Sequence, residues 1–281
     1  MVRRVLLGAI AVVLAVGAGA AAETPAQSKY PNWKGQWLRV GSGQGNAWDP
    51  AQSVAHQIVP LKPEYQAIYD AARADEAAGG QGIDPTYICV PSGMPREMIA
   101  VAPMEIIVTP ETTYIALELF STQRRIYTDG RDFPAKISLA FGGYSIGRWE
   151  DTTGSGHYDM LVAETRGVRG PHTYDSSGVP FHKDNQAIFK ERIFLDKDNP
   201  NLLRDEVTTF DHALTRPWTV TRSYRRIATE QKALWTETYC TEDNHHVLIG
   251  KENYVISGDG HLMPARKGQA PPDLRNFATG E

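Results

Sequence analysis

The feature that most constrains the fold is a series of short segments in which apolar and polar side chains alternate. Between residues 113 and 120, Ile115, Leu117 and Leu119 occupy every second position. This period of two is typical of a β-strand with one face in the core. Further segments of this kind, separated by turn residues, cover residues 124–128, 158–164, 187–196, 202–210, 218–226 and 234–239. Short strands with little helix between them predict an antiparallel β-barrel or β-sandwich rather than a parallel sheet.

One segment has helical spacing instead. One face of the segment 63–78 carries Tyr65, Ile68, Tyr69 and Ala72. Pro63 suits the first turn of a helix, and Gly79 and Gly80 end the pattern. We therefore expect a mainly β protein with one N-terminal helix over residues 63–78.

The N-terminus has the three parts of an export signal. Arg3 and Arg4 precede an apolar and small-residue run over residues 5–22, and this run ends in three alanines that suit a signal peptidase. An uncleaved membrane anchor is the alternative, because the run is just long enough to span a bilayer. Cleavage of a signal peptide over residues 1–22 would leave a linker over 23–32 and a single β-rich domain over 33–281, in the periplasm or secreted.

The net charge of the chain and the distribution of its charged residues exclude some classes of partner. The formal net charge of the chain is −4, and its 29 Lys and Arg residues are mixed with 33 Asp and Glu residues. Nucleic acids and anionic membranes attract a basic stripe, which this distribution lacks. We expect a small-molecule ligand or substrate, or another protein, as the partner, with no nucleic acid and no membrane contact after signal cleavage; the oligomeric state is not predicted.

The chain has two cysteines, Cys89 and Cys240. An exported protein meets an oxidising compartment, in which an even cysteine count indicates pairing. A catalytic thiol or a metal ligand is the alternative, but neither a CxxC nor a Cys/His cluster accompanies these residues. We predict a disulfide that joins the early part of the domain to its end.

One serine motif suggests a hydrolase. Residues 143–147, Gly-Tyr-Ser-Ile-Gly, match the GxSxG nucleophile elbow, in which a strand-to-helix turn projects the serine towards a histidine. The residues that follow offer no helix, and the chain lacks alternating βα units. We therefore expect a tight bend into a strand, and keep a serine hydrolase that uses Ser145 as an alternative function.

A histidine provides the leading catalytic candidate. His182 follows a turn, and an imidazole titrates near neutral pH, so His182 could act as a general base. Glu118 or Glu191 would be the partner acid, and Arg125 would hold an oxyanion or carboxylate. The hypothesis is a small-molecule-binding barrel with cofactor-independent acid/base chemistry of the isomerase, lyase or hydrolase type. A non-catalytic carrier is a further alternative, as is an extracytoplasmic interaction module.

Charged and aromatic residues within the strands could line the ligand site. The charged residues that interrupt apolar strands are Glu118, Arg125, Glu164, Glu191 and Arg192. If they face a barrel lumen, they form a polar floor in a pocket lined by Tyr127, Tyr144 and Trp149. If they face solvent, they are ordinary outer-face charges. The sequence alone leaves both interpretations open.

Metal and cofactor motifs are weak. His245 and His246 are adjacent, so on a strand they would point to opposite faces, and no HxH, HxxxH or HExxH spacing occurs. His182 with Asp184 is too short a pattern to define a site. A glycine-rich stretch over residues 41–45 lacks the Lys-Ser/Thr ending of a phosphate loop. We predict neither a metal nor a cofactor.

An ordered series of motifs resembles a widespread family of secreted bacterial proteins of unassigned function. The motifs are CVPSGMPR at 89–96, RIYTDGR at 125–131, SIGRWE at 145–150, Glu191-Arg192, Pro217-Trp218-Thr219 and Cys240. The resemblance implies one exported domain and a cysteine pair, and it implies no activity. This chain differs at 152–157, which extend a turn, and at Lys183, where the family tends to have serine after the histidine. Separately, Gly35-Gln36-Trp37 is similar to the GxW that opens lipocalin barrels, which favours a ligand-holding barrel.

Overall fold

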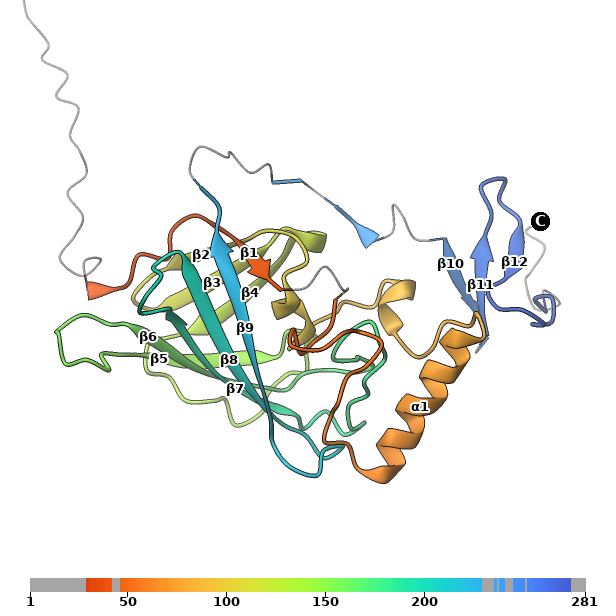
Figure 1. Cartoon of the computed structure of the whole chain (residues 1–281), viewed down its shortest axis with the longest axis horizontal. Helices are drawn as coiled ribbons and strands as arrows, with labels where there is room; N and C mark the ends of the chain where they lie inside the picture. Colours follow the sequence, from red (N-terminus) through yellow and green to blue (C-terminus); the bar gives the residue numbers. More distant parts are fainter. Residues whose placement is uncertain are drawn as a thin grey trace, which may run out of the picture.

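Nine strands form a closed barrel in which each strand pairs with the next and β9 returns to β1 (Figure 1). The computed structural model describes residues 29–41, 46–228, 235–236, 238–240, 245–250 and 252–273. The barrel strands are β1 (Gln36–Val40), β2 (Met104–Val108), β3 (Thr112–Leu117), β4 (Thr122–Tyr127), β5 (Tyr144–Glu150), β6 (Met160–Arg166), β7 (Ile188–Leu195), β8 (Leu202–Phe210) and β9 (Trp218–Arg226). All neighbouring strands are antiparallel except β4 and β5, which are parallel. The prediction of a mainly β barrel with one helix is confirmed.

The alternation in the sequence becomes the inside and outside of the barrel. In β8, Leu203, Asp205, Val207 and Thr209 are buried and the residues between them are partly exposed. The predicted bounds of β8 and β9 coincide with the structure, and those of β3, β4, β6 and β7 differ by a few residues at either end. The sequence pattern did not reveal β1 and β2 as strands, and for β5 it indicated only a bend into a strand, without bounds. It also predicted a strand at 234–239, where residues 235–236 and 238–239 form none.

The interior of the barrel is filled by side chains, several of which are charged. Arg124 of β4 pairs with Glu191 of β7, and both side chains are at most 2% exposed. Asp205 of β8 is fully buried near this pair. Burial and repulsion by Glu191 raise the pKa of Asp205 well above its ordinary value, although Arg124 and Arg222 act in the opposite direction. The barrel interior therefore contains buried charged side chains, among them the Arg124–Glu191 ion pair.

The helix α1 (Pro63–Ala77) lies outside the barrel, as Figure 1 shows in orange. Its buried residues Tyr69 and Ala72 face the loop between β6 and β7, and the Tyr69 hydroxyl donates to Ser177 Oγ at 3.2 Å. The chain just before the helix pairs with the β8–β9 turn, where the Lys62 N–H donates to the Ala213 carbonyl at 2.8 Å. The helix is therefore fixed against the two loops that lie at one end of the barrel.

A second sheet consists of β10 (His246–Ile249), β11 (Glu252–Ile256) and β12 (Leu262–Pro264), in blue in Figure 1. It contacts the segment after α1, because Asn253 Nδ2 donates to Gln81 Oε1 at 2.6 Å and the Tyr87 and His246 rings lie 5.3 Å apart. The predicted disulfide between Cys89 and Cys240 is confirmed and joins positions 151 residues apart. Within the described part of the chain, no helix is long and apolar enough to cross a membrane. The predicted signal peptide and most of the predicted linker lie outside the described residues.

Candidate functional site

A cleft of about 510 Å³ lies between α1 and the loop that connects β6 to β7, and we call it the α1 cleft. Aromatic and aliphatic side chains form most of its walls, including Tyr65 and Ile68 of the helix and Phe181 of the loop. The polar groups that line it include His172, Thr173, His182, Lys183 and Asn185. A mostly apolar hollow of this size with a few polar groups is the usual form of a small-molecule site.

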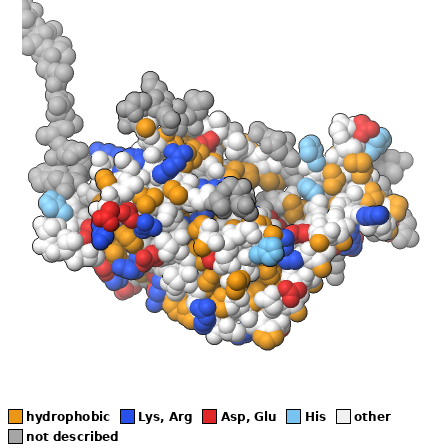
Figure 2. Space-filling model, viewed as in Figure 1, with side chains coloured by type: hydrophobic (Ala, Val, Ile, Leu, Met, Phe, Trp, Pro, Cys, Tyr) orange, Lys and Arg blue, Asp and Glu red, His pale blue; other side chains and the backbone are white. Residues whose placement is uncertain are grey.

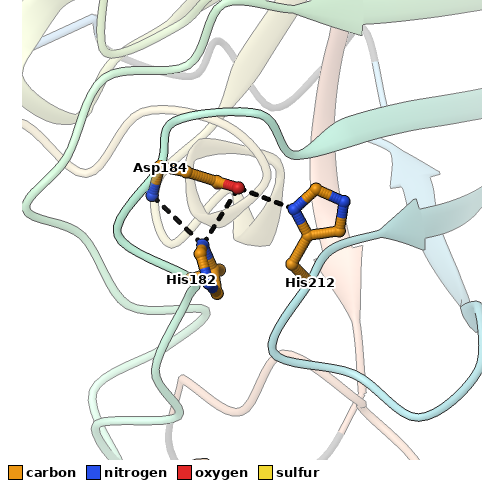
Figure 3. A group of neighbouring side chains, drawn as sticks. All are labelled: His182, Asp184 and His212. Atoms are coloured by element: carbon orange, nitrogen blue, oxygen red, sulfur yellow. Dashed lines mark hydrogen bonds and ion pairs between the residues drawn. The ribbon is translucent and has the colours of Figure 1, made fainter.

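His182 lines the α1 cleft and contacts a carboxylate. Its Nδ1 lies 3.0 Å from Oδ2 of Asp184, and Nδ1 of His212 lies 2.6 Å from the same oxygen (Figure 3). The His182 side chain is 33% exposed and that of His212 is 63% exposed. Burial acts to raise the pKa of Asp184, but hydrogen bonds from His212, the Gln186 backbone and His182 outweigh it and hold this pKa below its ordinary value. Asp184 is therefore an ionised acceptor between two imidazoles.

The tautomer of His182 decides what its ring can do. The backbone N–H of Asp184 lies 3.2 Å from the same Nδ1 that faces Asp184 Oδ2. A protonated Nδ1 donates to the carboxylate, and an unprotonated Nδ1 accepts from the backbone N–H. When Nδ1 carries the hydrogen and the ring is neutral, Nε2 is the free basic nitrogen. The local chain thus supports both forms of the imidazole.

Asp211 holds the two histidine-bearing loops together. Its Oδ1 accepts the backbone N–H of His182 at 3.1 Å and that of Ala213 at 2.7 Å. Burial raises the pKa of Asp211, although these two hydrogen bonds act in the opposite direction. A single carboxylate therefore fixes the backbone beside His182 and beside His212.

His172 is the second histidine of the α1 cleft. Its Nδ1 lies 3.0 Å from the Arg169 carbonyl, to which it donates, and its buried Nε2 has no partner among the described residues. Burial lowers the pKa of His172 to about 4, although the hydrogen bond to Arg169 opposes the shift. The ring packs on Phe181 with centroids 4.1 Å apart. At neutral pH His172 is therefore uncharged, and the one nitrogen that it leaves unpaired within the described chain is buried beneath the wall of the cleft.

The two glutamates expected to assist His182 have other partners. Both carboxylate oxygens of Glu191 pair with Arg124 inside the barrel, through Nη1 at 2.7 Å and through Nη2. Glu118 is buried, and its Oε1 accepts the backbone N–H of Thr236 at 3.1 Å and the hydroxyl of the same residue. The carboxylate that the structure places against His182 is Asp184.

The predicted ligand-binding residues fall into separate places. Arg125 is exposed on the outer face of β4, 5.9 Å from the Tyr114 ring, because alternation turns Arg124 inward. Tyr127 and Tyr144 do meet, with ring centroids 5.2 Å apart on neighbouring strands. Trp149 is buried and points the opposite way from Tyr144 along β5, where it packs on Trp33 at 4.8 Å. The structure therefore does not gather these four side chains with His182 in one cavity.

Ser145 lies within β5 and not on a strand-to-helix turn. It is 2% exposed, and its Oγ hydrogen bonds to Thr165 Oγ1 at 2.7 Å. Gly143 has a φ of +68°, which makes the bend into the strand. Gly147 sits where a Cβ would lie 2.8 Å from Ile126 Cγ2 and 2.9 Å from the Val162 carbonyl oxygen. The GxSxG glycines thus serve the bend and the close packing of β5, and the geometry gives Ser145 no exposed nucleophile position.

Two other hollows have no histidine among their described lining residues. One of about 650 Å³ lies between residues 30–35 and β2, and one of about 280 Å³ at the barrel mouth is lined in part by Glu97. Burial raises the pKa of Glu97 to about 7, opposed by Arg124 and assisted by Glu191. Figure 2 shows acidic and basic side chains intermixed over the strand side of the visible face, in keeping with the mixed charge of the sequence. The α1 cleft combines a hollow with two histidines and a carboxylate, so it is the candidate site.

The sequence pattern did not reveal three residues of this site. It placed Asp184 beside His182 but gave it no role, and it did not single out His172, Asp211 or His212. The Asp211-His212 pair follows directly on a strong strand, at 202–210, and polar residues at a strand end are a signal for a loop-borne site. His172 carried no such signal, because its chemistry comes from burial.

No protein-family model matches the amino-acid sequence, and no curated protein matches it. The resemblance to secreted bacterial proteins therefore stays a prediction.

Proposed function

We propose that the chain is an exported β-barrel protein that binds a small organic molecule in the α1 cleft and exchanges a proton with it through His182. The observation that carries this proposal is the position of His182, which lines a 510 Å³ apolar cleft while its Nδ1 lies 3.0 Å from Asp184. Export is supported by the Cys89–Cys240 disulfide, since such bonds persist in oxidising compartments.

The proton transfer follows from the pairing with Asp184. Donation of the Nδ1 hydrogen to Oδ2 leaves Nε2 as the base, and the carboxylate stabilises the imidazolium that forms when Nε2 takes a proton. An acid/base pair of this kind serves isomerase, lyase or hydrolase reactions without a cofactor. Asp184 replaces Glu118 and Glu191 as the partner, and Arg125 has no part in the proposal.

The walls of the cleft indicate the class of ligand. Tyr65 and Phe181 offer aromatic faces, and Nε2 of the partly exposed His182 accepts a hydrogen bond from a ligand when Nδ1 carries the ring hydrogen. An aromatic compound with a hydroxyl group satisfies both. We therefore propose small phenol-like molecules as the ligand class.

The binding half of the proposal is tested with a blocked cleft. Ile68 lines the cleft and is 39% exposed on α1, so Ile68→Trp fills the space without removing core packing. Saturation-transfer NMR with a panel of small phenols should give signals with the mature protein that Ile68→Trp reduces several-fold. If no signal depends on residue 68, the α1 cleft is not the ligand site.

The proton-transfer half uses 4-nitrophenol, whose ionised form absorbs visible light. Binding to the wild-type protein should increase the phenolate absorbance, and His182→Gln should bind the probe without that increase. His56→Gln is the matched control, because His56 is exposed and lies outside the cleft. A phenolate signal that survives in His182→Gln removes the base assignment, and binding without any phenolate signal in the wild type identifies a non-catalytic carrier.

A further inference from the structure

Three potential metal ligands converge beside the α1 cleft. His182, Asp184 and His212 each offer a ligand atom within 4.8 Å of the other two, and Oδ2 of Asp184 lies 3.0 Å from Nδ1 of His182 and 2.6 Å from Nδ1 of His212 (Figure 3). Two of them come from the β6–β7 loop and one from the β8–β9 turn. We infer that these three atoms bind one divalent transition-metal ion.

The ligand set fits zinc-type chemistry. Imidazole nitrogen and carboxylate oxygen bind Zn²⁺ at about 2.0–2.2 Å, which separates neighbouring ligand atoms of a tetrahedral site by about 3.3 Å. Oδ2 of Asp184 lies 3.0 Å from His182 Nδ1 and 2.6 Å from His212 Nδ1. Movements of less than an ångström would lengthen both Nδ1–Oδ2 distances to about 3.3 Å, the separation in a tetrahedral site. The three side chains are partly exposed, which leaves room for such movements. Three protein ligands leave a fourth position for water or a ligand oxygen.

The backbone around the trio is already fixed in place. Asp211 Oδ1 accepts backbone N–H groups from His182 and from Ala213, the residue after His212. The other oxygen of Asp184, Oδ1, accepts the backbone N–H of Gln186 at 3.0 Å. This bond turns Oδ2 towards the two imidazoles. Outer hydrogen bonds of this type orient metal ligands and strengthen binding.

Metal binding would also prevent the proposed proton transfer. This consequence rests on the proposed function, whereas the metal site itself does not. A metal ion on His182 Nδ1 takes the position of the hydrogen that Asp184 would accept. The base form with a free Nε2 and a protonated Nδ1 then no longer exists. Zn²⁺ occupancy and proton exchange with 4-nitrophenol therefore exclude each other.

Calorimetric titration of the metal-free full-length mature protein with Zn²⁺ tests the site. We expect one Zn²⁺ per chain, at least tenfold weaker binding to His212→Ala and to Asp184→Asn, and unchanged binding to His56→Ala. Mg²⁺, which prefers oxygen ligands, should bind at least tenfold more weakly than Zn²⁺. His212 is mostly exposed, so its replacement leaves the core intact. Absence of Zn²⁺ binding, or equal binding to His212→Ala, overturns the inference.

The two proposals can fail separately. Loss of Zn²⁺ binding in His212→Ala supports the metal site even if 4-nitrophenol is never ionised. Ionisation of 4-nitrophenol by a wild-type protein that binds no Zn²⁺ supports only the proton transfer. Suppression of the phenolate signal by Zn²⁺ in the wild type but not in His212→Ala supports the exclusion, and a signal that Zn²⁺ leaves unchanged at saturation contradicts it.

Discussion

Arg124 and Glu191 meet inside the barrel through two parallel contacts, one of which joins Nη1 to Oε1 at 2.7 Å. Arg124 Nη2 also donates to Thr165 Oγ1 at 3.0 Å. Both partners are almost fully buried, so each neutralises a charge that water cannot reach. Removal of one partner leaves the other as an uncompensated buried charge.

Single replacements in this pair should be strongly destabilising. We expect Glu191→Gln and Arg124→Met each to lower the free energy of unfolding by about 3–5 kcal/mol. The double variant should lose less than the sum of the two, because no unpaired charge remains. Urea unfolding of the four proteins measures the coupling.

The surface pair Arg192–Glu206 supplies the control. Its Nη1–Oε2 distance is 2.8 Å, close to that of the buried pair, but the Arg192 side chain is 55% exposed. Arg192→Met should cost no more than about 1 kcal/mol. Equal effects at Arg192 and Arg124 would show that burial does not set the cost.

Gly147 should tolerate no larger residue. A Cβ at this position would meet both Ile126 and the Val162 backbone, so Gly147→Ala should destabilise the protein by about 1–3 kcal/mol. A Cβ on Gly258 would meet no other part of the described chain within 4 Å, and the φ of Gly258 is not positive, so Gly258→Ala is the matched control. Thermal unfolding compares the two. An unchanged midpoint for Gly147→Ala would contradict the close packing of β4, β5 and β6.

His172 should make the protein less stable in mild acid. Its pKa in the folded state, about 4, is below the unfolded value near 6.5, so the unfolded state binds more protons between these values. Its contribution to stability is complete above pH 6.5 and is lost as the pH falls towards 4. Urea unfolding of His172→Gln between pH 7.5 and 4.5 should show a smaller loss than the wild type, and an identical profile would contradict the shift.

Glu97 should act in the opposite direction over a similar range. Its folded-state pKa of about 7 exceeds the unfolded value, so the folded state binds more protons between about pH 4.5 and 7. The contribution of Glu97 is therefore complete below about pH 4.5 and decreases as the pH rises to 7. Glu97→Gln should gain stability relative to the wild type at pH 7.5 and lose that advantage at pH 4.5. An advantage independent of pH would remove the assigned titration.

The barrel could be predicted because apolar and polar residues alternate along its strands. The alternation does not show which charged residues face the interior. In β4, Arg124 and Arg125 are both arginine, and only the position of Ile126 shows that Arg124 shares the inward face. For β5 the sequence indicated only the bend into a strand, because the GxSxG glycines interrupt the alternation of apolar and polar residues. The sequence left open whether the charged strand residues face the lumen or solvent, and the structure shows both: Glu191 faces the lumen, whereas Arg125 and Arg192 face outward.

The site was less predictable because its parts are brought together by loop contacts. His182 and Asp184 are neighbours in sequence, but His212 lies 28 residues from Asp184 and reaches it across two loops. The bond from the His182 backbone to Asp211 sets that approach, and no sequence spacing encodes it. Metal motifs built on one helix or one hairpin therefore cannot reveal this trio.

The Cys89–Cys240 bond gives the oxidised chain the topology of a ring with two tails. The ring contains β2 to β9, whereas β1, which lies between β9 and β2 in the barrel, belongs to the N-terminal tail. A protease cut in any connection between β2 and β9 leaves two pieces that migrate as one band until a reductant is added. A cut between β1 and Cys89 gives a separate fragment on a denaturing gel without any reductant. The strand that completes the barrel, β1, is therefore the one that the disulfide does not retain.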